Sequence, residues 1–569
     1  MNNTAMIGEM KRDSRWLEAI PYLAALIACA PLIVGGFPQG HDWAFELARV
    51  AEFSHALGEG QFPPHWAPNL YGGYGSPVFL FYAPAFVTVA TTASAVFGST
   101  AAGASLAVIL FSFIGVFAIR RLFGAIPGVD SLGGRIAATV FALHPYLIGD
   151  KLIRNANAEF AALCLLPFAL EGLMRLKRQP LRGAVVVAGG LALSILSHNL
   201  TALVCLALLL GGTLWLYGWR GARRTWLALV SGVAVGLLIA AFVWLPALAL
   251  QDAIHVEDLT RGKFDFHGQW KSFCAFFGYS QFFSAGALTP VALAFAVWVA
   301  VRHSADAFAG RRFLMGLLAA ALIFIGLQLR VSTPLWEWLP WLPLVQFPWR
   351  FMGPLALVSA VAAGMAAAAL LSQRPDRIRA SVEVGIFALC VANAWPQLAN
   401  YRPLSAAQSE TIAKAIQPEQ LRRGALNVSV LDEYLPRGAK PAVWKREARV
   451  GGRTVLSAVP KVEVEALETT GSRIALRVDA PTGTRLRLAR WYFPDWQAEL
   501  DGIPIPVESN SSGGIDVRLP APGGTFELVR RAPRSRRVGV ILSGLGTGLW
   551  LVLVCVHRRR RGAAREVPV

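Results

Sequence analysis

The sequence predicts an α-helical membrane protein that crosses the bilayer many times and carries a β-rich domain near its C-terminus. Of its 569 residues, 55% are hydrophobic and only 16% are charged, and the mean hydropathy is +0.48. A water-soluble protein of this size could not bury so much apolar surface. Apolar runs of helical length, rich in Leu, Ala and Val, recur from residue 17 to residue 398, and one more covers 538–556. This pattern favours a helical bundle over a β-barrel.

The positive charge of the chain predicts which loops face the cytoplasm. The net charge is +19, but Lys and Arg gather between the apolar runs, which argues against a nucleic-acid partner. Cytoplasmic loops of membrane proteins are enriched in these residues, so we expect both termini on the cytoplasmic side. The basic clusters lie at 11–15, 120–135, 175–182, 220–224, 302–312, 374–379 and 558–561.

Counting crossings between these clusters gives about twelve transmembrane helices. Two apolar segments, 77–97 and 101–119, precede Arg120 and Arg121, although only one crossing fits there. We assign the crossing to 101–119 and expect 77–97 to lie along the outer face. The alternative is that both segments cross and the arginine pair is external. The expected helices are 17–36, 101–119, 134–148, 158–174, 183–197, 201–218, 225–247, 285–301, 313–329, 353–371, 381–396 and 538–556.

Three regions follow from this topology. Residues 1–398 form a transmembrane module whose first outer loop is 37–100. Residues 399–537 carry more charge, alternating segments such as "RIALRVDA" and turn pairs such as "DG", which is typical of a β-rich domain, here on the outer side. Residues 538–569 form a last helix and a basic cytoplasmic tail.

Polar residues that are costly near a membrane collect on the outer side in this topology, and such residues are functional candidates. Each also has a structural explanation: Asp42 could cap a helix, Glu159 could favour a helix dipole, and Lys151 is better explained as a surface charge beside lipid headgroups. The candidates are His41, Asp42, Lys151, Arg154, Asn157, Glu159, His198, Asn199, Gln346 and Arg350.

This set suits transfer of a sugar from a lipid phosphate. A half-buried carboxylate such as Asp42 can act as general base on a hydroxyl, while Arg154, Arg350, His198 and Asn199 can hold a departing phosphate. Aromatic loops, which include Trp66 and Tyr71, offer flat faces to sugar rings or prenyl chains. A nucleotide donor fits less well, because no GxGxxG follows a strand and no GxxxxGK[ST] occurs.

Several stretches resemble multispanning glycosyltransferases of the GT-C superfamily. "GHDWAFELARVAEFSHALGEGQFPPHWAPNLYGGYGSPVFLFYAP" resembles their first outer loop, and "IRNANAEFAALCLLPF" resembles their second. "LSHNLTAL" and "FPWRF" look like later elements of a bacterial branch, the "6-pyruvoyl-tetrahydropterin synthase-related" membrane proteins akin to YfhO-like proteins. "ARWYFPDWQAELDGIPIPV" is similar to an element of YfhO-like outer domains, but has Asp495 where Gly is usual.

The resemblance implies a GT-C-like bundle with horizontal helices in the first outer loop, in a bacterial inner membrane with residues 399–537 in the periplasm. It also implies a polyprenyl-phosphate sugar donor and inverting transfer. By position Asp42 is the catalytic base and Glu159 is the second acidic residue, with His41 and Asn157 among the substrate-binding residues. A divalent metal (Mg or Mn) at Asp42 and Glu159 stays open, as does an acceptor that is a lipid, a glycan or a protein.

Two other functions remain as alternatives. One is a transporter or flippase for a lipid-linked glycan, which would show repeat symmetry and charges at mid-helix depth. The other is a non-catalytic subunit of an envelope glycan assembly system, whose β domain would bind a partner.

Overall fold

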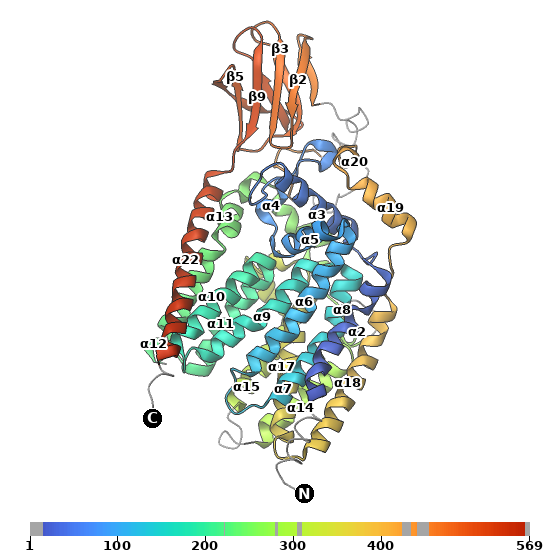
Figure 1. Ribbon diagram of the computed structural model, residues 1–569, viewed down its shortest axis with the longest axis vertical. Helices are drawn as coiled ribbons and strands as arrows, with labels where there is room; N and C mark the ends of the chain where they lie inside the picture. Colours follow the sequence, from blue (N-terminus) through green and yellow to red (C-terminus); the bar gives the residue numbers. More distant parts are fainter. Residues whose placement is uncertain are drawn as a thin grey trace.

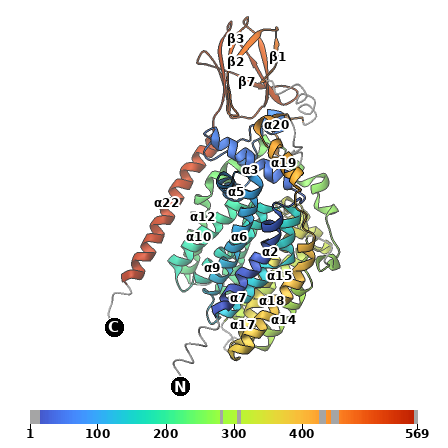
Figure 2. The ribbon, with the colours of Figure 1, turned by 45° about the vertical axis from the view of Figure 1, so that its right-hand side comes forward.

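The computed structural model describes residues 15–220, 222–278, 283–303, 310–423, 434–440 and 454–563. Long helices form a bundle, and β-sheets stand on one end of it (Figure 1). The first described helix begins and the last one ends at the opposite end of the bundle, which a view turned by 45° also shows (Figure 2). Both ends of the described chain therefore lie at the end of the bundle away from the strands, on different sides of it.

Eight helices in the described part of the chain are long and apolar enough to cross a membrane, and up to eleven crossings result if each bent helix pair is one span. The predicted bundle of membrane helices is therefore present. The eight spans are Trp16–Gly35, Thr100–Phe123, Asn157–Arg175, Pro180–Ser197, Asn199–Tyr217, Pro348–Leu371, Asp376–Ala399 and Arg534–Arg560. They correspond to α2 (Ile20–Gly35), α6 (Thr100–Phe123), α9 (Asn157–Arg175), α10 (Pro180–Ser197), α11 (Asn199–Tyr217), α17 (Met352–Leu371), α18 (Asp376–Ala399) and α22 (Arg534–Ala563).

Three of the predicted straight helices are bent instead. The break between α7 (Ser131–Ala142) and α8 (Pro145–Gly149) bends the chain by 43°, and Pro145 has no amide to continue the ladder of α7. The helices α12 (Arg223–Ile239) and α13 (Ala241–Ala249) meet at 74°, where the amide of Phe242 donates to the Ser543 hydroxyl of α22 at 3.0 Å.

The third bend, of 86°, separates α15 (Arg311–Leu327) from the turn that leads into α16 (Thr333–Trp338). The one remaining predicted helix, 285–301, corresponds to α14 (Leu288–Arg302), which has only 15 residues. At about 1.5 Å per residue it is shorter than the roughly 30 Å hydrocarbon core.

The first outer loop forms a layer of short helices over one end of the bundle (Figure 1). It contains α3 (Trp43–Gly58), α4 (Val78–Phe81) and α5 (Ala85–Phe97). With 13 residues α5 is too short to cross the bilayer, as expected if 77–97 lies along the outer face.

The strands form two antiparallel sheets between residues 455 and 530. Their buried faces share one apolar core, with Leu486 and Val517 on one sheet and Leu476 and Phe526 on the other. The predicted "DG" pair makes the two-residue turn between β5 and β6, where Asp501 and Gly502 both have positive φ. Strand order is β1-β4-β8-β7 in one sheet and β2-β3-β9-β5-β6 in the other.

The strands are β1 (Val455–Val459), β2 (Glu463–Thr469), β3 (Arg473–Asp479), β4 (Arg485–Trp491), β5 (Trp496–Leu500), β6 (Ile503–Ile505), β7 (Val507–Ser509), β8 (Gly514–Arg518) and β9 (Gly524–Arg530). Two helices precede them in the predicted β-rich segment, α19 (Ala406–Ala415) and α20 (Pro418–Arg422).

The sheets are fastened to the first outer loop. Arg490 donates to the carbonyl of Gly73 at 2.7 Å, and the amide of Trp491 donates to the carbonyl of Tyr74 at 3.0 Å. Arg530 pairs with Asp495, with 2.9 Å between Nε and Oδ1, and its guanidinium lies 4.0 Å from the Trp66 ring centroid. Asp495, which stands where Gly is expected, therefore pairs with the arginine that contacts the loop.

Candidate functional site

Asp42 lies in the loop that follows α2, and backbone contacts fix this loop beside Arg154. The amide of His41 donates to the carbonyl of Ile153 at 2.9 Å, and the amide of Asp42 donates to the carbonyl of Arg154 at 3.0 Å. Gly40 permits this close approach, because a Cβ there would lie 2.5 Å from the carbonyl oxygen of Ile153. Two segments that are far apart in the sequence are thereby joined.

The carboxylate of Asp42 is not used for helix capping. Asp42 occupies the N-cap position of α3, but its side chain accepts no capping hydrogen bond. It makes no hydrogen bond or ion pair with the other residues of the described ranges, although it is only partly exposed. Burial raises the pKa of Asp42 above its ordinary value, and the charges of Arg154, His41 and Arg350 partly offset this. The structural explanation as a cap therefore fails for this side chain.

A cavity of about 710 Å³ opens beside Asp42. The chain reaches it from the first outer loop, from the turn before α9, from the junction of α10 and α11, and from the segments 247–271 and 344–350. Seven of the predicted candidates line it: His41, Asp42, Arg154, His198, Asn199, Gln346 and Arg350.

Arg154 ends a π-helical turn, Asp150–Arg154, of a kind that is often found at functional sites. Its Nη1 donates to Asp150, to Glu159 at 3.2 Å and to the Tyr146 hydroxyl at 3.5 Å. Its guanidinium also lies 4.8 Å from the Trp349 ring centroid. All three hydrogen bonds use Nη1, so the other N–H groups of the Arg154 guanidinium remain available to a ligand in the cavity.

Arg350 approaches the same place from the other half of the chain. It lies on the 3-10 turn Pro348–Phe351 that precedes α17. Its Nη1 donates to the carbonyl of Val345 at 3.0 Å and to the side chain of Gln346 at 2.9 Å. Its Nε lies 3.7 Å from Glu159, so this carboxylate is shared between the two arginines.

Glu159 does not line the cavity, contrary to the expectation of a second catalytic acid. Its Oε1 accepts the Tyr146 hydroxyl at 2.6 Å, while Oε2 accepts from Arg154. Because both of its oxygens already accept hydrogen bonds, Glu159 is suited to orienting the arginines and is not suited to binding a metal together with Asp42. Within the described ranges, no cluster of three or more His, Cys, Asp or Glu residues has metal-ligand geometry.

The remaining predicted polar residues divide between the cavity and its supports. His198 caps α11, and its Nδ1 lies 2.9 Å from the Thr201 hydroxyl. Asn199 donates to the carbonyl of Phe81 at 3.1 Å and so holds the first outer loop against α11. Asn157 donates to Glu46 on α3 at 3.4 Å and does not line the cavity.

Three expectations about single residues are wrong. Trp66 and Tyr71 are buried and do not line the cavity. Trp66 packs instead against Arg530, whose guanidinium lies 4.0 Å from its ring. Lys151 is not a surface charge. It is 1% exposed, and its Nζ donates to the Ser112 hydroxyl at 3.2 Å inside the bundle.

Sequence reasoning missed several residues at this site. Tyr146 lay in an apolar run, where an aromatic residue is usually core, and Trp349 lay in the quoted "FPWRF" stretch but was not named as a site residue. Asp150 gave a usable signal, since it precedes Arg154 by four residues, the spacing of a helical ion pair. Lys263 and Lys271, which also line the cavity, lie in a loop without a recognisable motif.

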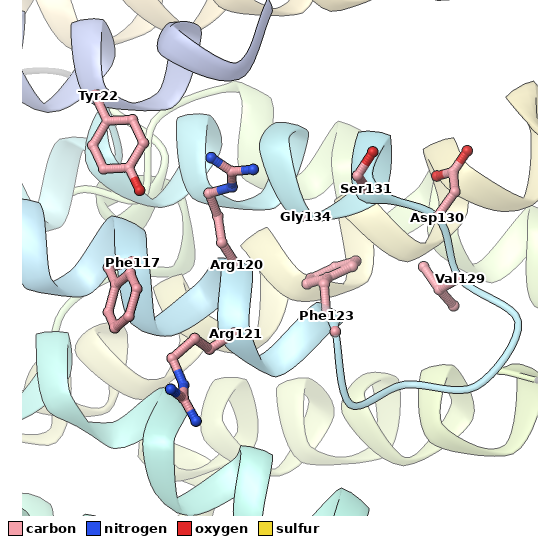
Figure 3. A pocket seen from close by; sticks show the side chains of 10 residues that line it. Tyr22, Phe117, Arg120, Arg121, Phe123, Val129, Asp130, Ser131 and Gly134 are labelled. Atoms are coloured by element: carbon pink, nitrogen blue, oxygen red, sulfur yellow. The ribbon is translucent and has the colours of Figure 1, made fainter. Parts of the chain in front are cut away.

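A second cavity of about 410 Å³ lies at the other end of the bundle, beside α6 and the start of α7 (Figure 3). Arg120 and Arg121 line it, but their side chains point in opposite directions. Arg120 pairs with Glu18, and Arg121 lies 2.8 Å from Glu171. Because each guanidinium already has a carboxylate partner and the two side chains diverge, this cavity is a poor phosphate site.

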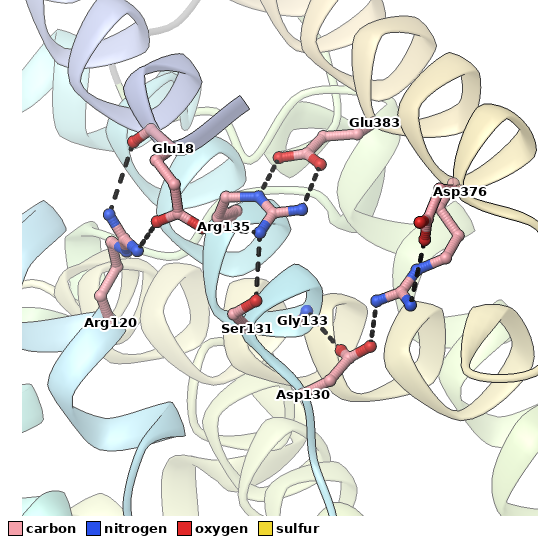
Figure 4. A network of polar contacts seen from close by, with 9 residues as sticks. Glu18, Arg120, Asp130, Ser131, Gly133, Arg135, Asp376 and Glu383 are labelled. Carbon is pink, nitrogen blue, oxygen red and sulfur yellow. Dashed lines mark hydrogen bonds and ion pairs between the residues drawn. The ribbon is translucent and has the colours of Figure 1, made fainter. Parts of the chain in front are cut away.

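An ion-pair network adjoins the second cavity (Figure 4). Arg135 on α7 holds Glu383 of α18 at 2.7 Å and Glu18 at 2.9 Å. Arg379 of α18 pairs with Asp130, which precedes α7. The network ties helices from both halves of the bundle at the end that carries the basic clusters.

Comparison with known proteins gives partial similarity to solved glycosyltransferases. The sequence matches no protein-family profile, and no curated protein sequence matches it significantly. The arabinofuranosyltransferase AftD from Mycobacteria is 19% identical, with a TM-score of 0.45 over 68% of this chain and 27% of AftD. ArnT from Cupriavidus metallidurans in the apo state is 17% identical, with a TM-score of 0.40 over 78% and 73% of the two chains.

The archaeal oligosaccharyltransferase AglB from Archaeoglobus fulgidus, in complex with an inhibitory peptide and a dolichol-phosphate, is 14% identical. Its TM-score is 0.40 over 71% of this chain and 60% of AglB. These neighbours are GT-C glycosyltransferases, whereas this chain spans about a quarter of the length of AftD, 27%.

Proposed function

We propose that this protein is a membrane glycosyltransferase that transfers a sugar from a polyprenyl-phosphate donor to an acceptor hydroxyl. One observation carries the proposal: the unengaged carboxylate of Asp42 lines the same cavity as the guanidinium groups of Arg154 and Arg350. A base and two phosphate-binding cations at one place are what such a reaction needs.

The reaction is a single displacement. Asp42 takes the proton of the acceptor hydroxyl, whose oxygen attacks the anomeric carbon of the donor sugar. The bond between that carbon and the phosphate oxygen breaks, and the lipid phosphate leaves with the electron pair. Arg154 and Arg350 stabilise the charge that grows on the phosphate. Attack from the side opposite the phosphate inverts the configuration at the anomeric carbon.

The surroundings of the cavity favour a lipid-linked donor. Leu248 lines the cavity and is 59% exposed, and it lies on α13, which belongs to a bent helix pair apolar enough to span the membrane. A prenyl chain can lie there while its phosphate reaches the arginines. The charge pattern supports a periplasmic position for this face in a bacterial inner membrane. The "ARWYFPDWQAELDGIPIPV" element supports membership of the YfhO-like branch.

Undecaprenyl phosphate is the probe that tests the arginines. We expect it to bind the full chain in detergent or nanodiscs, and Arg350→Met to weaken binding at least about tenfold, because a charge-assisted hydrogen bond to phosphate is lost. Arg437→Met, at an exposed arginine of the same face, is the control. Equal affinity in wild type and Arg350→Met would contradict the proposed phosphate site.

The pH profile of turnover tests the base. Asp42 acts only when deprotonated, so activity rises with pH through its pKa, and burial moves this acidic limb above the ordinary value of 3.8. Glu46→Gln is the matched variant, because burial raises the pKa of neighbouring Glu46 to about 7. We expect that variant to keep the acidic limb and Asp42→Asn to lose it, as measured by kcat/KM against pH.

A further inference from the structure

The segment that follows α15 has an exposed apolar face. It runs from Arg330 to Trp338, which includes α16, and lies at 86° to α15. Val331, Leu335 and Trp338 are four and three residues apart, so their side chains share one face of a helix. All three are exposed, and Trp338 is 77% exposed. This face therefore presents large apolar side chains to the surroundings of the protein.

The other side of the segment packs on a loop of the outer face. Trp336 is buried, and its ring stacks on Phe266 with 5.1 Å between the centroids. Glu337 lies 3.2 Å from Nε2 of His267, the residue after Phe266. Both contacts are made by the loop 263–271, which contributes to the wall of the large cavity. The segment is therefore tied to the cavity wall on one side and bare on the other.

The exposed face continues the apolar surface of a spanning helix. Leu322 and Ile323, in the second half of α15, are both exposed, and α15 together with the segment is apolar enough to cross a membrane. With 17 residues, α15 alone extends about 26 Å, close to the thickness of the hydrocarbon core. A segment that leaves such a helix at 86° runs along the membrane surface. Its apolar face is therefore continuous with a surface that contacts lipid.

The residue types of the segment fit the headgroup region of a membrane. Tryptophan is enriched there because its ring is apolar while its N–H is polar, and the segment ends at exposed Trp338 and is followed by exposed Trp341. Arg330 and Glu337 are also exposed on this segment, and such charges are costly in hydrocarbon. The combination places the segment at the edge of the hydrocarbon core.

From this arrangement we propose that Val331, Leu335 and Trp338 insert into the headgroup region of the membrane at the cavity end of the bundle. The segment then lies flat at the membrane surface, with its polar side toward water. Because its other side packs on the loop 263–271, this contact attaches one wall of the cavity to the membrane. The contact with lipid does not depend on the proposed sugar transfer.

Spin labels at single cysteines measure the depth of this face. The full chain carries Cys274→Ser and Cys555→Ser, which remove its exposed thiols, and is placed in nanodiscs of phosphatidylethanolamine and phosphatidylglycerol. Oxygen partitions into lipid and a nickel chelate stays in water, so the ratio of their collision rates with the label reports its depth. Thermal unfolding of each variant shows that the fold is kept. The labelled variants are Leu335→Cys, Glu337→Cys and Trp338→Cys.

Two further positions calibrate the ratio. Lys414→Cys, at an exposed position of α19, is the outer-side control, and Leu545→Cys, at an exposed position of α22, is the span control. We expect the labels at Leu335 and Trp338 to give an oxygen-to-nickel ratio at least about threefold above the outer-side control and below the span control. The label at Glu337, on the polar side, should match the outer-side control.

Three results would overturn the proposal. A ratio at Trp338→Cys equal to that of the outer-side control means that the face lies in water. A ratio equal to that of the span control means that it lies in hydrocarbon. A label shielded from both oxygen and nickel means that the face contacts protein, which in the purified sample is a second copy of this chain.

Discussion

Replacing Asp42 by Asn is expected to lower turnover by about 10²–10⁴-fold, the usual contribution of a general base, while the fold and the affinity for undecaprenyl phosphate stay near those of wild type. Asn has the same shape but cannot take a proton. The carboxylate of Asp42 caps no helix and pairs with no other described residue, so no structural contact is lost with it. A single-turnover assay with a polyprenyl-phosphate sugar measures the loss of turnover, and thermal unfolding shows whether the fold is kept.

The control for this substitution is Asp479→Asn, the same chemical change at an exposed position of β3. It should leave turnover unchanged. A normal rate in Asp42→Asn would remove Asp42 as the base, whereas absence of sugar transfer by the wild-type chain would leave the transporter and the non-catalytic subunit as the alternatives. A variant that loses both turnover and lipid binding would instead mean that Asp42 shapes the cavity.

The large-scale fold was predictable because two strong physical constraints on membrane helices leave clear patterns in an amino-acid sequence. Spanning helices need long apolar runs, and their cytoplasmic ends attract Lys and Arg. Counting these clusters alone put Asp42, Arg154 and Arg350 on one face, and in the structure the three line one cavity. The bends were not predictable in this way, because α12 and α13 form one continuous apolar run in the sequence. The bend between them lies where the hydroxyl of Ser543, on the distant helix α22, accepts a hydrogen bond from the amide of Phe242.

The roles of single side chains depended on tertiary contacts that the sequence does not display. Trp66 looked like a sugar platform because it lies in an aromatic loop, but Arg530, more than four hundred residues later, covers its ring. Glu159 looked like a catalytic acid, and only the packing of Tyr146 and Arg154 against it shows that its oxygens are occupied. Residue type and spacing therefore located the site, whereas the role of each side chain followed only from contacts between distant segments.

The second large effect concerns stability. Replacing Arg135 by Met is expected to destabilise the protein by about 3–5 kcal/mol, because it leaves a buried charge without its partner. Arg135 donates to both oxygens of Glu383, at 2.7 and 2.8 Å, and Glu383 is 1% exposed with no other ion partner in the described ranges (Figure 4). Denaturant or thermal unfolding of the full chain in one detergent measures the change.

The reverse substitution should cost less. In Glu383→Leu, Arg135 keeps Glu18 at 2.9 Å, and Glu18 is 44% exposed, so the remaining charges stay paired and partly solvated. The double variant Arg135→Met/Glu383→Leu should recover much of the stability lost in Arg135→Met, since an apolar pair of similar volume replaces the buried ions. Strictly additive losses in this cycle would show that the two side chains are not coupled. Lys414→Met, in an exposed pair with Glu410, should leave unfolding unchanged and so serves as the control.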